Sequence, residues 1–140
     1  MKESKYFELS EFLSSETALV LGIENFPSWE EVERMKKFAI EVLDVIRDQW
    51  GQPLLVSSGY RVPSLNAAVG GAPTSDHQNG LAVDIKLASW SKRKPSELYN
   101  LVYEMTEKGI IEIDQVIYYR SKKIVHIGVG ERLRKQFIVK

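Results

Sequence analysis

The stretch Thr74-Ser75-Asp76-His77-Gln78-Asn79-Gly80-Leu81-Ala82-Val83-Asp84-Ile85 organises the rest of this chain. Its first half is polar and turn-prone, and its second half is an apolar run that one acid, Asp84, interrupts. An acid inside an apolar run is expected to be buried, and a buried carboxylate is costly unless it is paired or bound to a cation. The stretch therefore predicts a loop followed by a strand, and it is where we expect the chemistry of the protein.

The chain contains only two histidines, so the position of each one is informative. His77 lies in the polar half of the stretch, and His126 lies in a second apolar run, residues 124–127. One histidine from a loop, one acid from a strand and one histidine from another strand can converge on a metal ion. Three nitrogen and oxygen ligands, with a water in the fourth position, describe a catalytic zinc site rather than a structural one.

Each of these residues also has a purely structural interpretation. A lone loop histidine is usually a surface residue, and His126, on the strand face opposite Val125 and Ile127, can be a core histidine with satisfied hydrogen bonds. Asp84 shares a strand face with Ala82 and need not point inward, so it can also bond backbone groups or pair with a basic side chain. Spacing alone leaves the metal-site and structural interpretations open.

Arg61 stands just beyond a short strand expected over residues 54–57. Its planar guanidinium group has five donors, which suits a substrate carboxylate or a developing oxyanion. The alternative is an ordinary surface arginine, or an ion pair with Asp84 or Asp76. Ser75 has two interpretations as well, because its hydroxyl can bind substrate or can cap a turn.

Hydrophobic spacing predicts the remaining elements. Apolar residues between Trp29 and Trp50 recur mostly at intervals of three and four, which predicts one amphipathic helix facing the core. Ser28, followed three residues later by Glu31, forms a capping box that begins this helix. Residues 4–26 are expected to be a mostly irregular lead-in. Further helices are expected over residues 64–69 and 95–109, and strands over residues 54–57, 81–87, 113–119, 124–129 and 136–139. The pattern predicts an α+β fold, with helices packed on a small, largely antiparallel sheet.

Composition limits the possible classes of function. At 140 residues, 44% of them hydrophobic, the chain is expected to form one domain over residues 1–140. Lys and Arg total 19, as do Asp and Glu, so the net charge of zero gives no support to nucleic-acid binding. The absence of cysteine excludes disulfides and cysteine-ligated zinc. We expect no membrane segment, and the lack of an apolar leader makes a cytoplasmic location the default expectation. The sequence leaves the oligomeric state open.

The sequence resembles the zinc D-Ala-D-Ala carboxypeptidase family, and looks closest to its small branch of phage-type and bacterial cell-wall peptidases. The resemblance covers nearly the whole chain. It is carried by Ser58-Gly59-Tyr60-Arg61, Leu65-Asn66-Ala67-Ala68-Val69-Gly70-Gly71, Ser75-Asp76-His77 with Gly80, Ala82 and Asp84-Ile85, and by Asp114-Gln115-Val116-Ile117 and Val125-His126-Ile127. Any one of these pieces is weak, but the combination is highly specific.

The resemblance implies a fold of the hedgehog/D-Ala-D-Ala-peptidase type and one Zn²⁺ ion held by His77, Asp84 and His126. It also implies that Arg61 contacts the substrate or stabilises the oxyanion, and Ser75 is the second substrate-binding residue that we expect. The implied activity is hydrolysis of peptidoglycan stem peptides, by trimming a terminal D-Ala or cutting a cross-link. Such an enzyme is expected to act on the cell wall after release or in a phage context.

The chain departs from the family pattern at one position. Well-characterised members carry an acid as general base three residues before the second histidine, and this chain has Lys123 there. Asp76, Asp114, Tyr118 and Tyr119 are the candidates for that proton transfer. A non-catalytic zinc-binding cell-wall or phage structural module of the same fold is therefore the alternative function.

Overall fold

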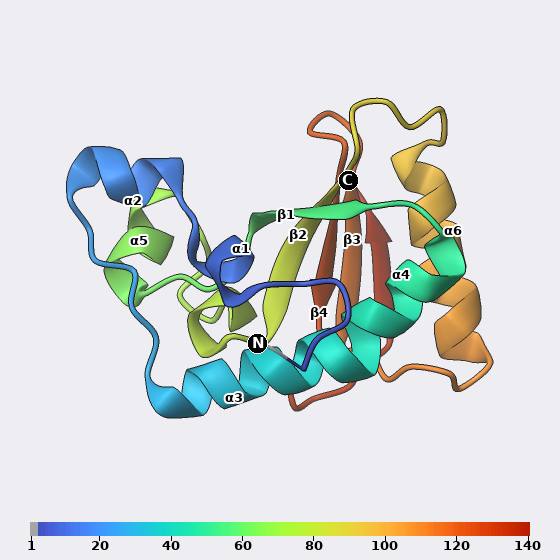
Figure 1. Ribbon diagram of the computed structural model, residues 1–140, viewed down its shortest axis with the longest axis horizontal. Helices are drawn as coiled ribbons and strands as arrows, with labels where there is room; N and C mark the ends of the chain where they lie inside the picture. The colour runs from blue at the N-terminus through green and yellow to red at the C-terminus, as the bar shows by residue number, and fades with distance from the viewer. Residues whose placement is uncertain (1–2) are drawn as a thin grey trace.

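A five-stranded mixed sheet lies at the centre of the computed structural model, which describes residues 3–140 (Figure 1). In spatial order the strands are β1 (Leu54–Ser58), β2 (Ala82–Leu87), β4 (Ile124–Gly128), β3 (Gln115–Tyr119) and β5 (Gln136–Val139). Neighbouring strands run antiparallel except β3 and β5, which run parallel. The α+β fold with a largely antiparallel sheet is confirmed, and each predicted strand is present within one or two residues at its ends.

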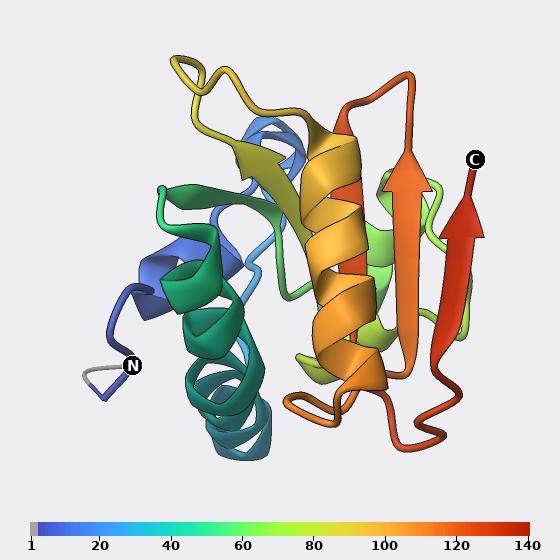
Figure 2. The same cartoon turned by 90° about the vertical axis from the view of Figure 1, so that its right-hand side faces the viewer.

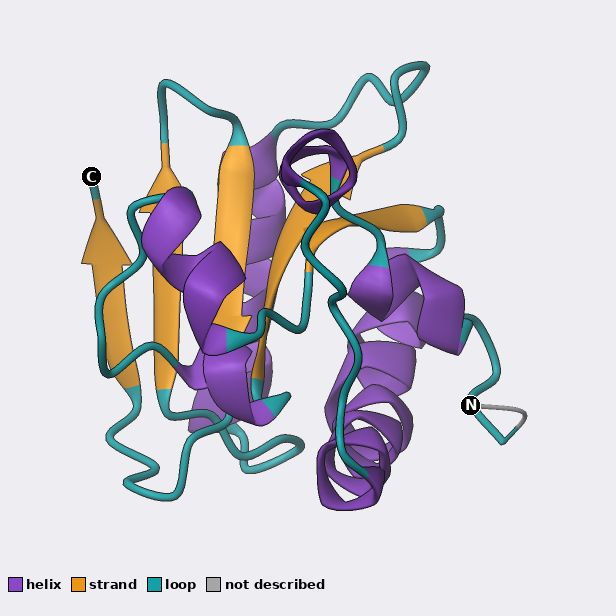
Figure 3. Ribbon diagram, turned by 90° about the vertical axis from the view of Figure 1, so that its left-hand side faces the viewer, coloured by secondary structure: helices purple, strands orange, loops and turns teal. Residues whose placement is uncertain are grey.

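Helices cover both faces of this sheet. On one face, α6 (Pro95–Glu107) packs against β3 and β4, next to the helix that ends at Trp50 (Figure 2). On the opposite face lie α5 (Pro63–Ala68) and the short 3₁₀ helix η2 (Asp76–Asn79), which contacts β2 (Figure 3). None of the helices in the described part of the chain has the length and apolar character needed to cross a membrane.

The long helix predicted between Trp29 and Trp50 is present, but it contains a π-helical turn. It consists of α3 (Trp29–Phe38), η1 (Ala39–Leu43) and α4 (Asp44–Trp50). The predicted capping box is confirmed: the Ser28 hydroxyl accepts from the Glu31 amide at 3.2 Å, and the Ser28 amide donates to the Glu31 carboxylate at 2.8 Å. Periodicity at three and four residues does not reveal η1, because one π turn changes the spacing by a single residue.

The predicted apolar face of this helix is buried from its second turn onward. Met35, Phe38 and Ile46 have at most 3% of their surface exposed. Trp29, which the spacing also assigned to the core, is 76% exposed, so that assignment is wrong. Trp29 is the first residue of α3, and α3 starts away from the sheet (Figure 1).

The lead-in is more helical than predicted. It contains α1 (Leu9–Leu13) and α2 (Glu16–Leu21), and the Ser15 hydroxyl caps α2 by accepting from the Ala18 amide. Phe7 and Phe12 are buried in the core, with their rings edge to face at 6.3 Å. Helices of five and six residues are not stable alone, so tertiary packing rather than local sequence determines them.

Candidate metal centre

The register of the sheet brings Asp84 and His126 side by side. In the antiparallel pairing of β2 with β4, Asp84 lies directly opposite His126, and His126 lies opposite Ile117 of β3. Successive strand residues point to opposite faces. Val83, Ile85, Val125 and Ile127 therefore point into the core, while Asp84 and His126 point to the face that carries α5 and η2. The His126 Nδ1 atom lies 2.9 Å from Asp84 Oδ1.

His77 reaches the same place from η2. The Ser75 hydroxyl accepts a hydrogen bond from the His77 amide at 3.2 Å, so Ser75 caps this turn. Capping a turn was one of the two roles that the sequence suggested for Ser75. The chain then turns into β2 at Gly80, whose φ of +73° is in the left-handed region and whose hydrogen faces the backbone of α3. A side chain there would be strained by its backbone conformation. The turn leaves His77 only 2% exposed.

The ring of His77 is oriented by a backbone carbonyl. Its Nδ1 atom lies 2.6 Å from the Gly59 carbonyl oxygen. Because a carbonyl can only accept, Nδ1 carries the proton, and the lone pair is on Nε2, which lies 3.4 Å from Asp84 Oδ1. Metal-ligating histidines typically donate their other ring nitrogen to such an outer partner.

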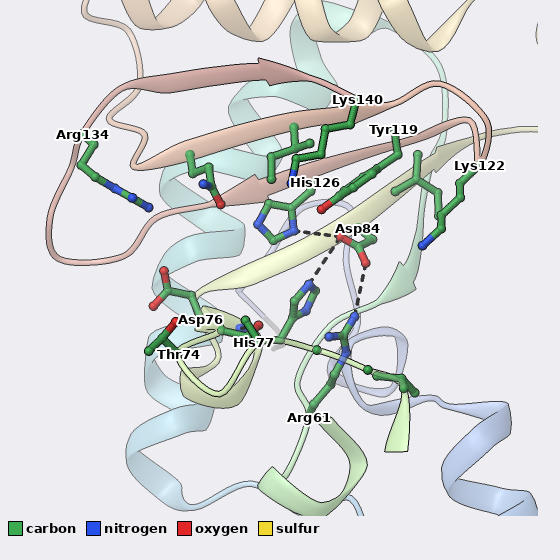
Figure 4. Close-up of a pocket in the computed structure, with 18 of the residues that line it drawn as sticks. Arg61, Thr74, Asp76, His77, Asp84, Tyr119, Lys122, His126, Arg134 and Lys140 are labelled. Atoms are coloured by element: carbon green, nitrogen blue, oxygen red, sulfur yellow. Dashed lines mark hydrogen bonds and ion pairs between the residues drawn. The ribbon is translucent and has the colours of Figure 1, made fainter. Parts of the chain in front are cut away.

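The three residues form a compact group of donor atoms. One ligand atom from each of His77, Asp84 and His126 lies within 4.8 Å of the other two, and the side chains converge on one point of the pocket (Figure 4). The structure thus brings together the three residues that were expected to share an ion. Two imidazole nitrogens and one carboxylate oxygen are ligands that suit zinc.

Asp84 supplies negative charge at the centre of this group. Burial disfavours its ionised form, but the hydrogen bond with His126 and the proximity of His77 outweigh burial and hold the pKa of Asp84 well below its ordinary value. Asp84 is therefore a carboxylate at neutral pH. It can bind a cation without first losing a proton.

Arg61 borders the group on the side of β1. Its side chain donates to Ser58 Oγ at 3.1 Å and to Asn66 Oδ1 at 3.2 Å, and its Nη2 atom lies 3.5 Å from Asp84 Oδ2. The Arg61 amide donates to the His77 carbonyl, which ties both segments together. Burial lowers the pKa of Arg61 while Asp84 raises it, and an arginine stays charged under all such conditions. The structure therefore contains the ion pair between Arg61 and Asp84 that was one of the predicted roles of Arg61.

Gly71 makes room for this arrangement. A Cβ atom at Gly71 would lie 2.1 Å from Asn66 Oδ1 and 3.0 Å from Arg61 Nη1. Any side chain would therefore displace the amide that positions Arg61. The loop after α5 can approach the guanidinium group only because this residue is glycine.

The donor group lies in a cavity of about 460 Å³. Gln115, Ile117 and Tyr119, alternate residues of β3, line one wall. The Tyr119 side chain extends toward His126 and Asp84 (Figure 4). Burial raises the pKa of Tyr119 and the charge of Asp84 raises it further, against the opposing effect of Arg61. The phenol is therefore protonated at neutral pH and is a hydrogen-bond donor.

The four candidates for the proton-transfer group have different positions. Asp114 has no exposed surface and accepts three hydrogen bonds from Arg134, so it has a structural partner. Tyr118 lies on the opposite strand face from the pocket and packs against the core. Asp76 and Tyr119 line the pocket. The structure therefore leaves these two as candidates.

Our sequence analysis missed four basic residues that line the same pocket. Lys122 lies in the turn between β3 and β4, Arg132 and Arg134 in the loop before β5, and Lys140 directly after β5. We call these four residues the cationic rim. No local pattern connects them, because only the folding of β3, β4 and β5 brings these connecting segments to the edge of the same pocket.

Comparison with protein families identifies the family of this chain. The model of a family described as Peptidase M15 matches residues 5–128, which include Arg61, Ser75, His77, Asp84 and His126. No curated protein matches the chain. The match ends before the loop that carries Arg132 and Arg134.

Proposed function

Because the chain belongs to the Peptidase M15 family, the metallopeptidases of the zinc D-Ala-D-Ala carboxypeptidase type, we propose that it is a zinc-dependent peptidase of peptidoglycan stem peptides. It acts on the wall after release or in a phage context, and residues 1–140 form one domain of this type. The convergence of His77, Asp84 and His126 in a cavity beside Arg61 is the observation that carries the proposal.

The side chains present fit a zinc ion. His77 Nε2, Asp84 Oδ1 and His126 Nδ1 would hold it, and the hydrogen bond from His77 Nδ1 to Gly59 already orients the first of these ligands. Three protein ligands leave a position open for water or substrate. When bound, zinc supplies a Lewis acid that polarises a carbonyl and lowers the pKa of a water molecule.

Arg61 is the group that we assign to the substrate oxygen. Its guanidinium is held by Ser58 and Asn66, so the group is already fixed at the wall of the pocket before substrate binds. Donors fixed in this way stabilise a developing oxyanion without reorganisation during the reaction. Ser75, which also lines the pocket, keeps its proposed contact with substrate in addition to capping η2.

Tyr119 is the second donor in this proposal. Its protonated hydroxyl extends toward the donor group (Figure 4), and we assign to it a hydrogen bond to the oxygen that becomes negative. Asp76 is the remaining carboxylate among the described residues that line the pocket, and we assign it the transfer of the proton from water to the leaving amine. A general base contributes typically 10²–10⁴-fold, so a displaced base makes a slow enzyme rather than an inactive one.

Mass spectrometry of two substrates tests this function. The zinc-loaded protein is incubated with a stem peptide that ends in D-Ala-D-Ala and with a cross-linked stem-peptide dimer. We expect release of D-Ala from the first or of monomer from the second, and loss of the product in His126→Ala. Zinc-loaded protein that leaves both substrates intact at high enzyme concentration would contradict a peptidase.

The second candidate is a zinc-binding wall or phage structural module without turnover. Lys123 favours it, because well-characterised members of the family carry at this position an acidic residue that acts as the general base, and this chain has a lysine there. Under this alternative the zinc-loaded protein sediments with purified peptidoglycan and releases no peptide. The same incubation therefore distinguishes the two functions.

A further inference from the structure

Exposed large hydrophobic side chains are concentrated in one part of the chain. Among the described residues there are twelve of them, and five lie between residues 19 and 29, including the four most exposed. The five are Leu19 (82% exposed), Val20 (79%), Leu21 (57%), Phe26 (72%) and Trp29 (76%). Single exposed apolar residues are ordinary, but a group of them typically marks a surface that binds another molecule.

These five side chains lie at one end of the molecule, away from the metal centre. Three belong to α2, Phe26 belongs to the connecting segment 22–28, and Trp29 begins α3. Figure 3 faces this end, where the chain runs from α2 at the top, through the connecting segment, to α3 at the bottom. Ala18 is the buried residue of α2, so this helix turns its three larger apolar side chains to solvent. None of the five lines the pocket around the metal centre, so a partner bound here leaves that pocket open.

The same part of the chain is strongly acidic. Residues 6–33 contain seven glutamates and no aspartate, lysine, arginine or histidine. Five of the seven are exposed, namely Glu8, Glu16, Glu24, Glu30 and Glu33. Within residues 3–140 none of the seven forms an ion pair. We call the exposed apolar and acidic side chains from Glu16 to Glu30 the α2–α3 surface. It combines apolar contact area with uncompensated negative charge.

This charge disfavours several occupants of the α2–α3 surface. Two copies of the chain packed through the same surface would bring like charges together, with no cation of either copy between them. Anionic lipid headgroups and nucleic-acid phosphates would be repelled for the same reason.

The basic part of the chain is also a poor partner for this surface. Residues 120–140 contain seven basic residues and one acid, but four of the seven are the cationic rim of the pocket. A second copy that docked its α2–α3 surface on these residues would cover the metal centre. Association of copies from end to end would therefore block the site on which the proposed function depends.

We propose that the α2–α3 surface is the docking site of a partner protein that presents a basic amphipathic segment. The apolar face of such a segment covers Leu19, Phe26 and Trp29, and its lysines or arginines pair with the flanking glutamates. Complementary charge fixes the choice of partner and speeds the encounter, while the apolar contact holds the complex. This inference goes beyond the proposed peptidase and does not depend on it, because no residue of the α2–α3 surface lines the pocket.

Designed peptides test the two requirements of this site. One helical peptide has leucines along one face and lysines elsewhere, a second has glutamates in place of the lysines, and a third has the composition of the first with its leucines spread around the helix. Fluorescence anisotropy measures binding to the full chain. We expect the first peptide to bind about tenfold more tightly than either other peptide at about 20 mM NaCl, and its advantage over the glutamate peptide to shrink at about 300 mM. Equal binding of the three peptides at low salt would overturn the proposal.

Variants locate the bound peptide on the molecule. Leu19→Ser and Phe26→Ser are each expected to weaken binding of the lysine peptide about five- to tenfold, because each removes apolar contact area. Glu24→Gln should weaken it about two- to fivefold, as for an exposed ion pair.

Matched controls lie elsewhere on the surface. Trp90→Ser changes a side chain that is also exposed, and Glu104→Gln changes an exposed acid of α6. Both should bind the peptide normally, and circular dichroism should show all five variants to be folded. Equal losses in the controls, or normal binding by Leu19→Ser and Phe26→Ser, would overturn the proposal.

Two further measurements test the other occupants. In sedimentation velocity the chain alone should remain one species as its concentration is raised, and it should not sediment with phosphatidylglycerol vesicles. Self-association that Phe26→Ser abolishes would replace the partner protein with a second copy. Vesicle binding that Phe26→Ser abolishes would replace it with a lipid surface. Because none of these measurements uses peptide hydrolysis, their outcome is independent of the proposed peptidase.

Discussion

At the scale of single residues, backbone carbonyls and amides set the geometry of the site as much as side chains do. The Gly59 carbonyl fixes the protonated nitrogen of His77, and the His77 carbonyl in turn accepts from the Arg61 amide. His77, a proposed metal ligand, and Arg61, the proposed oxyanion donor, are therefore held in place by one pair of hydrogen-bonded backbone segments. A change in either segment is expected to move both groups together.

Arg61→Lys tests the oxyanion role. An ammonium group cannot reproduce the planar fork that bonds Ser58 and Asn66, so we expect kcat to fall on the order of 10²–10³-fold. Zinc affinity should change little, because Arg61 is not a proposed ligand. Arg120→Lys, in the exposed turn after β3, serves as the control and should retain full activity. Near-normal turnover by Arg61→Lys would show that Arg61 does not stabilise the oxyanion. A decrease in both melting temperature and zinc affinity would show that Arg61 has a structural role.

Tyr119→Phe removes one hydroxyl from the pocket. If this hydroxyl donates to the developing oxyanion, its loss costs about 1.5–3 kcal/mol, which is roughly 10- to 150-fold in kcat, with KM little changed. Tyr118→Phe is a matched control on the opposite face of the same strand, and it should keep its kcat. Steady-state kinetics on the stem peptide compare the two variants. Equal rates for both variants would show that Tyr119 only lines the pocket.

At the scale of elements, β2 and β4 serve the core and the site at the same time. Val83, Ile85, Val125 and Ile127 are at most 1% exposed, and Asp84 and His126 alternate with them on the other face. This alternation is visible in the sequence, which is why the two strands were predictable, whereas the expectation that His77, Asp84 and His126 share an ion came from the family resemblance. The short helix η2 was not predicted, because a polar turn of four residues has no hydrophobic period.

The cationic rim shows where sequence reasoning ends. Lys122 and Arg132 look like ordinary surface residues, since each stands in a polar connecting segment. Their common location depends on β5 pairing with β3 in parallel, and register between distant strands is a tertiary property. The exposure of Trp29 was unpredictable for the same reason, because the tertiary fold determines which part of a helix is covered. The long helix, in contrast, was predictable because apolar residues recur mostly at intervals of three and four between Trp29 and Trp50.

The start of the long helix gives a test at this scale. Ser28→Ala removes the hydroxyl that accepts from the Glu31 amide, and we expect the free energy of unfolding to fall by about 0.5–2 kcal/mol. Ser28 does not line the pocket, so turnover should be unchanged. Ser121→Ala, in the exposed β3–β4 turn, is the control. An unchanged denaturation midpoint for Ser28→Ala would show that the cap does not stabilise the helix.

Asp114 gives a second test, through the loop that carries Arg132 and Arg134. The hydrogen bond from Arg134 lowers the pKa of Asp114 below its ordinary value and outweighs the opposing effect of burial. A carboxylate with a lowered pKa in the folded state stabilises the fold above the unfolded-state pKa, and this stability is lost as pH falls through the folded-state value. We expect Asp114→Asn to have a lower free energy of unfolding at pH 7 than the unmodified protein. As the pH falls below about 4, its free energy of unfolding should decrease less than that of the unmodified protein.

Urea denaturation from pH 7 down to pH 2 measures both parts of that expectation. Asp48→Asn, at an exposed acid whose pKa is also lowered by its partners, controls for the general effect of removing a surface charge. Parallel pH profiles for Asp114→Asn and the unmodified protein would contradict a stabilising role for the ionised form of Asp114.

At the scale of the whole molecule, a metal ion would join segments that the chain separates widely. His77, Asp84 and His126 come from η2, β2 and β4, and the segment between the last two contains all of α6. The donor atoms of these residues lie within 4.8 Å of one another, so we expect an ion to bind with little rearrangement of the fold. The cationic rim then surrounds this centre in a chain whose net charge is zero.

Anomalous diffraction at the zinc edge tests the central claim most directly. Crystals of protein supplied with one equivalent of zinc should show a single anomalous peak between His77 Nε2, Asp84 Oδ1 and His126 Nδ1. Zn–N distances of about 2.0–2.1 Å and a Zn–O distance of about 2.0–2.2 Å are expected. Data collected just below the edge should lose the peak, which identifies the element. A peak at any other site, or no peak in protein that elemental analysis shows to be free of zinc, would contradict the account.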